Sequence, residues 1–577
     1  MIDPFVDDRS SGQTSSIDRS VTRRTILQTL TGLGVGTVAF QRALAVQVQE
    51  RGKLTAEMIQ QAEWIAGLTL DDDERQRVAS SLGSILDSAE TIRQQAIDFD
   101  VVPAQVFRPD FFYAQAASST AVAEQKPPRI QVAWSVGSQA PAISESQLPF
   151  ASIQQQADLL AGKQLSSREL TQIYLARLKQ YDPQLECIVT LLEEHALQLA
   201  GESDERRATR QSRGILDGIP WLAKDIIAIP PWKTTWGAEP FKDQVRNDTA
   251  TVATRLTDAG AIVLGKSTVG ALAWGDVWFS GMTRNPWNLE QGSSGSSAGS
   301  ASAVAAGLTT FALGSETLGS IISPCRRCRT SGLRPTFGRI SRFGCMTLAW
   351  SMDKVGPIAR HVSDLALVFA ALLGPDAKDP SVVERSFRWP IPDRIKDLTI
   401  GITHDELNLT EQKVLAFLES SGAKVRQVEL TSRIPVDSLS VMLGVEAAAV
   451  FEQPFRADRK ANYGMWSDTF RNAPFVSAIH FLQANRLRGQ LIVETERKLA
   501  QVDVVLGGND LTLTNLTGHP SLIVSCGTDS VGEIKMPGVI KLTAASYREE
   551  MLLHVGHAIQ QALPPTPLAP SLSMAGK

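Results

Sequence analysis

The sequence predicts an α/β fold preceded by a small helical hairpin, and three observations support this. The chain has 577 residues, 43% of them hydrophobic, so it can bury a large core. From about residue 149 onward, amphipathic helix patterns alternate with short apolar runs, as in folds whose strands are joined by helices. Between residues 54 and 97, apolar residues recur at helical spacing.

The charge balance bears on the class of partner, and the cysteine count bears on disulfide bonding. The 57 basic and 61 acidic residues give a net charge of -4, without the basic bias that marks nucleic-acid binding. We therefore expect a small-molecule or peptide-like partner and no nucleic acid, and a homodimer is compatible with the sequence. Five cysteines in a chain of this length do not indicate a disulfide framework.

Residues 1–45 have the pattern of an export signal. "TRRTILQ" is followed by an apolar, glycine-rich run at residues 26–40, and "QRALA" ends in a small-x-small site at Ala45. Arg23 and Arg24 resemble the twin-arginine signal, which exports folded bacterial proteins. We expect a periplasmic or extracellular protein with no stable membrane insertion. A frayed tail with a chance arginine pair is the alternative.

Two segments separate this signal from the α/β region. Residues 46–100 are expected to form a helical hairpin, because apolar residues such as Leu82 fall on one helical face and the acidic run at residues 71–74 suits a helix start. Residues 101–148 mix Pro, Ser, Ala and Gln without periodicity, which is typical of a linker or strap. The α/β domain then spans residues 149–570.

The α/β domain shows an early helix start and an unusual lysine. "SSRE" at residues 166–169 has the form of a capping box and opens an amphipathic helix. The apolar run "LDGIPWLAKDIIAI" is interrupted by Lys224 and Asp225. Because lysine is almost never fully buried without a partner, Lys224 either reaches the surface or is a candidate catalytic group.

"GAIVLGKS" at residues 260–267 matches the phosphate-binding loop pattern, but its context predicts a different structure. That motif requires a strand before its first glycine, whereas the helix-like "TVATRLTDA" precedes Gly260 and "AIVL" is itself a strand former. Gly260 suits the end of a helix. We predict a helix, a turn and a strand here, and no nucleotide site.

"GSSGSSAGSAS" at residues 292–302 could be a flexible linker, a phosphate cradle or active-site backbone. It continues without a break into "AVAAGLTTFALGSETLGSIISP", which disfavours a linker, and "AGSASAVAAGL" predicts a closely packed helix. "GSSAG" also matches the nucleophile elbow G-x-S-x-G, with Ser297 as nucleophile. That elbow needs a preceding strand, and "TRNPWNLEQGS" predicts turns instead.

Three sequence motifs follow one another along the chain: "AKD" around Lys224, the Ser/Gly run around Ser296, and "GSETLGSIISP" with Ser320. Together with "RLTDAGAIVLGKS", "RNPWN", "GLRPTFGRISRFG", "WSMDKVGPIAR" and "NLTGHPSLIVSCG", they resemble the amidase signature family over roughly residues 149–563. The resemblance implies a large mixed, twisted sheet covered by helices on both faces. It also implies cleavage of a carboxamide C–N bond without a cofactor.

By the same resemblance, Lys224 is the base, Ser296 the bridging serine after a cis peptide, and Ser320 the nucleophile of an acyl-enzyme. Ser296 and Ser320 lie 24 positions apart, which is the family's spacing. A serine needs a base to take its proton, and a lysine can serve near pH 7 only if its pKa falls by about 3 units. Burial and hydrogen bonds could supply that fall. Gly295 and Ser297 are expected to form the active-site wall.

The resemblance assigns the oxyanion hole to the backbone N–H groups of Thr317, Leu318, Gly319 and Ser320. The family often has Gly-Gly-Ser-Ile-Arg at the nucleophile, whereas this chain has Leu318 and Ile322 in place of the first glycine and the arginine. Glu316 stands where many members have aspartate. Leu318 keeps its N–H group, so these departures concern the substrate class more than the mechanism.

Other chemistry-bearing residues are expected to be structural. His519 in "GHPS" lies away from both serine motifs. Cys325 and Cys328 in "CRRC" could form a metal half-site or a redox pair, but no second pair exists, so we expect packing residues and no metal. The helical hairpin resembles the small subunit of tRNA-dependent amidotransferases, here as a brace for the amidase core.

Three functions remain open from sequence. An exported amidohydrolase with a Ser-Ser-Lys triad is favoured because Lys224, Ser296 and Ser320 are all present. The others are a catalytically silent relative that binds ligands, and an α/β-hydrolase-type esterase that uses Ser297. Substrate selection is expected from two variable segments, residues 380–389 and 451–475.

Overall fold

The computed structural model describes residues 54–95, 129–134, 143–392, 394–403 and 407–567, with residues 570 and 572. The predicted export signal and most of the predicted linker lie outside these residues. The chain divides into two compact units, one comprising residues up to Gly83 with Phe475–Ser477, and the other comprising the remaining residues. Across the described part of the chain, no helix combines the length and apolar character needed to cross a membrane.

The first unit contains helix α3 (Ala56–Ala62) and the part of α4 (Asp72–Arg93) up to Gly83. Thr55 caps α3, because its hydroxyl accepts a hydrogen bond from the Met58 N–H at 3.3 Å. Asp71 and Glu74 accept each other's backbone N–H groups at the start of α4, at 2.9 and 3.0 Å. Two helices therefore occupy the segment expected to form a hairpin.

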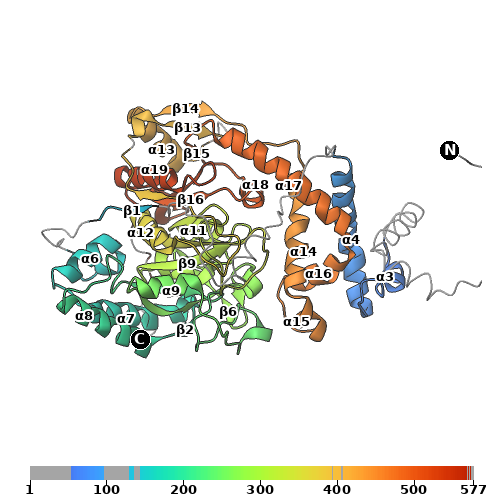
Figure 1. The fold of residues 1–577 in the computed structure, drawn as a ribbon, viewed down its shortest axis with the longest axis horizontal. Coiled ribbons are helices and arrows are strands. Elements are labelled where there is room, and N and C mark those ends of the chain that lie inside the picture. The colour runs from blue at the N-terminus through green and yellow to red at the C-terminus, as the bar shows by residue number, and fades with distance from the viewer. Residues whose placement is uncertain are drawn as a thin grey trace, which may run out of the picture. The chain divides into compact units, whose positions relative to one another are not determined.

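The second unit is built on an eleven-stranded mixed sheet (Figure 1). Its order is β14 (Lys424–Gln427), β13 (Thr399–Ile402), β15 (Val504–Leu506), β17 (Ile534–Thr543), β16 (Ser521–Val531), β10 (Ser331–Arg334), β11 (Lys354–Ala359), β9 (Phe311–Glu316), β3 (Pro220–Lys224), β4 (Ile262–Ser267) and β2 (Ile188–Leu191). β3 runs parallel to β4 and β9, whereas β11 is antiparallel to β9. Every position of β3, β4 and β11 is buried, so both faces of the central sheet are covered. The predicted α/β fold is confirmed.

Helices surround this sheet, and α7 and α8 lie side by side in Figure 1. In chain order they are α6 (Ile153–Ala161), α7 (Ser167–Leu185), α8 (Glu193–Ala208), α9 (Thr251–Asp258), α10 (Ala298–Ala305), α11 (Ile322–Arg327), α12 (Val362–Leu372), α13 (Leu409–Ser420), α14 (Val441–Val450), α15 (Glu452–Ala457), α16 (Trp466–Asn472), α17 (Ala478–Leu499), α18 (Leu511–Leu516) and α19 (Glu549–Ala562). The predicted capping box at Ser166 and Glu169 starts α7, with both reciprocal hydrogen bonds present.

Short strands form three small sheets beside the large one. β1 (Ile130–Val132) pairs in parallel with β12 (Phe387–Trp389), and β5 (Val277–Trp278) pairs with β6 (Gly281–Met282). β7 (Arg284–Asn285) and β8 (Asn288–Gly292) form a hairpin. The expectation of turns alone over residues 283–293 was therefore wrong, although β8 does not join the large sheet as an elbow strand would.

The glycine-containing segments fold as predicted from their context. α9 ends before Gly260, which has φ +80°, and "AIVL" leads into β4, so the predicted helix, turn and strand are confirmed and a phosphate loop is not formed. α10 begins directly after Ser297, and all of its residues are buried. From Ser296 onward the "GSSGSSAGSAS" run is therefore buried in the core, and it is not a linker.

Candidate active site

Three chain segments meet at one edge of the central sheet. Lys224 ends β3, residues 293–297 precede α10, and residues 317–321 join β9 to α11. Since β3 and β9 are parallel neighbours, with Ala223 opposite Leu313, their carboxyl ends lie side by side. Lys224 and the segment after β9 are thereby placed next to each other.

Lys224 is fully buried and does not reach the surface. Its Nζ lies 2.9 Å from Ser296 Oγ, 3.1 Å from Ser297 Oγ and 2.8 Å from Ser315 Oγ. Burial lowers the pKa of Lys224 to about 7, against the opposing charges of Asp353 and Glu316. A large share of this amine is therefore neutral near pH 7 and able to accept a proton.

The peptide bond between Gly295 and Ser296 is cis. A Cβ atom on Gly295 would lie 1.8 Å from the carbonyl oxygen of Gly275, so only glycine fits this close backbone contact. Ser297 is fully buried, and its hydroxyl donates to Ser315 O and accepts from Ser315 N, both at 3.1 Å. The Ser297 hydroxyl is thus engaged in hydrogen bonds and not free to attack a substrate.

Ser320 follows β9 and precedes α11, and its carbonyl accepts the Ser297 N–H at 3.0 Å. No described residue hydrogen-bonds to the Ser320 hydroxyl, so the structure brings Ser296 to Lys224 but does not show a Ser296–Ser320 hydrogen bond. Among the described residues, none accepts a hydrogen bond from the backbone N–H groups of Thr317, Leu318, Gly319 or Ser320. Four neighbouring donors are therefore available to bind an oxyanion.

Glu316 fixes the turn that carries these donors. Its buried carboxylate accepts hydrogen bonds from Ile321 N at 2.8 Å and Ile322 N at 2.9 Å. Arg334 Nη1 and Asn515 Nδ2 bind its other oxygen at 2.8 and 2.7 Å. Burial alone would raise the pKa of Glu316, but the charges of Arg334 and Lys354 outweigh it and lower this pKa to about 2. Glu316 is therefore ionised and locked in place.

Sequence reasoning did not identify Ser315, Arg334 or Asn515 as part of this site. All three lie in stretches that carried the family resemblance, Ser315 in "GSETLGSIISP", Arg334 in "GLRPTFGRISRFG" and Asn515 in "NLTGHPSLIVSCG", and that was the available signal. Ser315 and Asn515 are brought in by the pairing of distant strands and helices. Leu318 is half-buried and packs against a hydrophobic cluster that includes Leu516, so its side chain points into the core of the unit.

The residues expected to be structural have the following surroundings. His519 is fully buried, with Nδ1 2.7 Å from Thr517 Oγ1 and Nε2 2.7 Å from Glu496 Oε2. Cys325 and Cys328 are free and fully buried, and burial raises the pKa of both thiols. Within the described ranges, no cluster of three or more His, Cys, Asp or Glu residues is arranged to hold a metal.

One of the two expected substrate segments lies close to the active-site wall. Trp466 in α16 donates its indole N–H to Leu272 O at 2.9 Å, and its ring lies 5.2 Å from that of Trp274. Trp274 precedes Gly275, which contacts Gly295. Residues 380–389 instead contain β12 and pair with β1.

Comparisons with known proteins agree on one family. A sequence model described as Amidase matches residues 169–501. A glutamyl-tRNA(Gln) amidotransferase subunit from Pseudomonas syringae pv. tomato is 32% identical over 70% of this chain and 95% of that protein. Its counterpart from Thermosynechococcus vestitus is 30% identical over 70% of this chain and 96% of that protein. The X-ray structure of the native peptide amidase from Stenotrophomonas maltophilia is similar with a TM-score of 0.64 and 27% identity, covering 74% of this chain and 100% of that one.

Proposed function

This chain belongs to the amidase signature family, whose enzymes act on C–N bonds, and we propose that it is an amidohydrolase that works through a Ser-Ser-Lys triad. The observation that carries this proposal is the buried hydrogen bond of 2.9 Å between Lys224 and Ser296, together with the lowered pKa of Lys224. A neutral amine beside a serine hydroxyl is the arrangement that a lysine base requires.

In the proposed reaction, Ser320 Oγ attacks the amide carbonyl carbon and its proton passes through Ser296 to Lys224. The N–H groups of residues 317–320 hold the oxyanion of the tetrahedral intermediate. The C–N bond then breaks, and the leaving amine takes the proton back through Ser296. Water, deprotonated by the same route, hydrolyses the ester on Ser320 and releases the acid.

Water is the proposed acyl acceptor, although two relatives are named amidotransferase subunits. The support comes from the export-like pattern around Arg23 and Arg24, since a protein carried out of the cytoplasm is separated from aminoacyl-tRNA. We also propose this export. Release of free acid and amine from a linear amide, with no other acceptor present, distinguishes a hydrolase from an obligatory transferase.

A fluorophosphonate probe tests the triad, because it reacts preferentially with a serine whose hydroxyl is activated by a neighbouring base. Wild-type protein should be labelled at Ser320, and Ser320→Ala should abolish labelling. Ser296→Ala should slow labelling less than loss of the base does, since water can relay the proton. Ser212→Ala, at an exposed serine, is the matched control and should label normally.

Two outcomes of this experiment would contradict the proposal. Labelling that survives Ser320→Ala but disappears in Ser297→Ala would move the nucleophile to the "GSSAG" segment, as in an elbow-type esterase. A folded wild-type protein that neither labels nor hydrolyses any amide would support the catalytically silent relative.

A further inference from the structure

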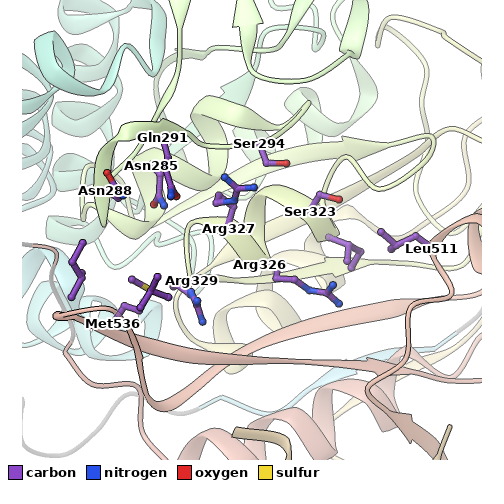
Figure 2. Close-up of a pocket in the computed structure, with 13 residues that line it drawn as sticks. Asn285, Asn288, Gln291, Ser294, Ser323, Arg326, Arg327, Arg329, Leu511 and Met536 are labelled. Carbon is purple, nitrogen blue, oxygen red and sulfur yellow. The ribbon is translucent and has the colours of Figure 1, made fainter. Parts of the chain in front are cut away.

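A cavity of about 500 Å³ lies beside the active-site segments, and Lys224, Ser296 and Ser320 are not among the residues that line it (Figure 2). Ser294, two positions before Ser296, lines it, as do Ser323 and Leu511. The latter two side chains also border Gly319, since a Cβ atom there would lie 3.0 Å from Ser323 Oγ and 3.6 Å from Leu511 Cδ1. The cavity therefore begins next to the predicted nucleophile.

The lining of this cavity carries positive charge and amide groups. Three arginines, Arg326, Arg327 and Arg329, line it together with two asparagines and one glutamine, and none of its described lining residues is acidic (Figure 2). Arg329 is already paired, with Nη1 2.8 Å from Asp529 Oδ2. The cavity consequently keeps a net positive charge.

Arg326 and Arg327 are exposed, and neither forms an ion pair with any residue in the described part of the chain. On the Ser294 side, the carboxylate of Asp276 accepts the Ser294 N–H at 2.7 Å. Lys541 on β17 forms an ion pair with Asp510. Two guanidinium groups are thus free to bind an anion, and a guanidinium matches the geometry of a carboxylate.

We propose that this cavity binds a carboxylate of the substrate, so that the enzyme prefers amides that carry a negative charge away from the scissile bond. This inference rests on the proposed function, because it assumes that Ser320 is the reacting group. Arg326 and Arg327 determine the preference, and the amide side chains of the lining supply further hydrogen bonds to the charged end of the substrate.

The helix sets the length of the preferred substrate. Arg326 and Arg327 end α11, which begins at Ile322, two positions after Ser320, so a helix rise of about 6 to 8 Å separates them from the start of the helix. Side chains on a helix lean toward its N-terminus, which in α11 is the end next to Ser320. We therefore expect a carboxylate joined to the scissile carbonyl by a short aliphatic chain to reach the arginines better than one on the adjacent carbon.

The first test compares two 4-nitroanilides of equal chain length, glutaryl with a terminal carboxylate and pentanoyl without one. For the wild type, kcat/KM should be at least about tenfold higher for the glutaryl compound, and this advantage should shrink as salt screens the exposed charges. Arg326→Gln with Arg327→Gln should remove the preference through KM and leave hydrolysis of the pentanoyl compound unchanged. Arg168→Gln, at an exposed arginine on α7, is the matched control and should change neither value.

The second test measures binding and needs no turnover. Calorimetry should show that the glutaryl compound binds to full-length Ser320→Ala about tenfold or more tightly than to the same protein carrying both arginine substitutions. Equal affinities would overturn the inference while leaving fluorophosphonate labelling of Ser320 intact. Binding that depends on the arginines without any wild-type preference for the glutaryl substrate would also overturn it, because the bound anion would then not be a substrate group. A failed proposed function would instead appear as absent labelling.

Discussion

The pH dependence of acylation is the most direct consequence of the buried lysine. Lys224 must lose its proton to act as a base, and its pKa is lowered to about 7 by burial, so the neutral fraction rises with pH. That fraction is about one-tenth at pH 6 and about nine-tenths at pH 8. The rate of fluorophosphonate labelling should therefore rise about tenfold between these values and then level off.

Lys224→Met removes the amine while keeping an apolar side chain of similar length. Labelling should slow by about 10²- to 10⁴-fold, and the rise between pH 6 and 8 should disappear. Lys179→Met, at an exposed lysine of α7, should retain both the wild-type rate and the wild-type profile. The labelling reaction is quenched at set times, and the labelled fraction measured by mass spectrometry gives the rate at each pH.

Asp353 allows a second test of the pH profile of labelling, because its negative charge raises the pKa of Lys224 against the effect of burial. Asp353→Asn should move the midpoint of the profile to lower pH, a readout that does not depend on the absolute rate. A wild-type midpoint near the ordinary lysine pKa, or a tenfold rise that persists in Lys224→Met, would refute the assignment of Lys224 as the base.

Three further predictions concern the oxyanion segment, its support and export. Gly319→Val should abolish turnover while leaving circular dichroism unchanged, because Gly319 has φ +90° and a Cβ atom there would lie 3.0 Å from Ser323 Oγ; near-normal turnover would place the reacting carbonyl elsewhere. The pKa of Glu316 is lowered from 4.5 to about 2, so its contribution to stability is present above pH 4.5 and is lost as pH falls through 2. Denaturant titrations should accordingly show that the difference in unfolding free energy between wild type and Glu316→Gln shrinks by roughly 3 kcal/mol as the pH falls from 4.5 to 2. A difference that stays constant with pH would contradict the lowered pKa of Glu316. Replacing Arg23 and Arg24 with lysine should leave the protein unprocessed in the cytoplasm when cell fractions are compared, and normal processing would contradict a twin-arginine signal.

Local signals predicted the local structure well. The Ser166 capping box, the glycine at the end of α9 and the small-residue helix α10 each depend on neighbours within a few positions, so the sequence contains the information needed. The β7–β8 hairpin was missed because its turn residues dominate a segment whose strands are only two and five residues long.

Long-range contacts around the site could not be derived in this way. Glu316 is held by Arg334, 18 positions away, and by Asn515, 199 positions away. Only the fold brings these groups together, and the family resemblance named the reacting residues without naming their supports. The positive charge of the cavity was not predicted either, because "CRRC" was considered only as a cysteine motif and not for Arg326 and Arg327.

The distances along the chain that separate Lys224 from its partners also decide when activity can appear during synthesis. Ser296 lies 72 positions after it and Ser315 lies 91 positions after it. A ribosome must therefore release β9 and let it pair with β3 before the amine has its hydrogen-bond partners, and such non-local pairing is slow. The nascent polypeptide consequently remains inert toward amides until the centre of the sheet has closed.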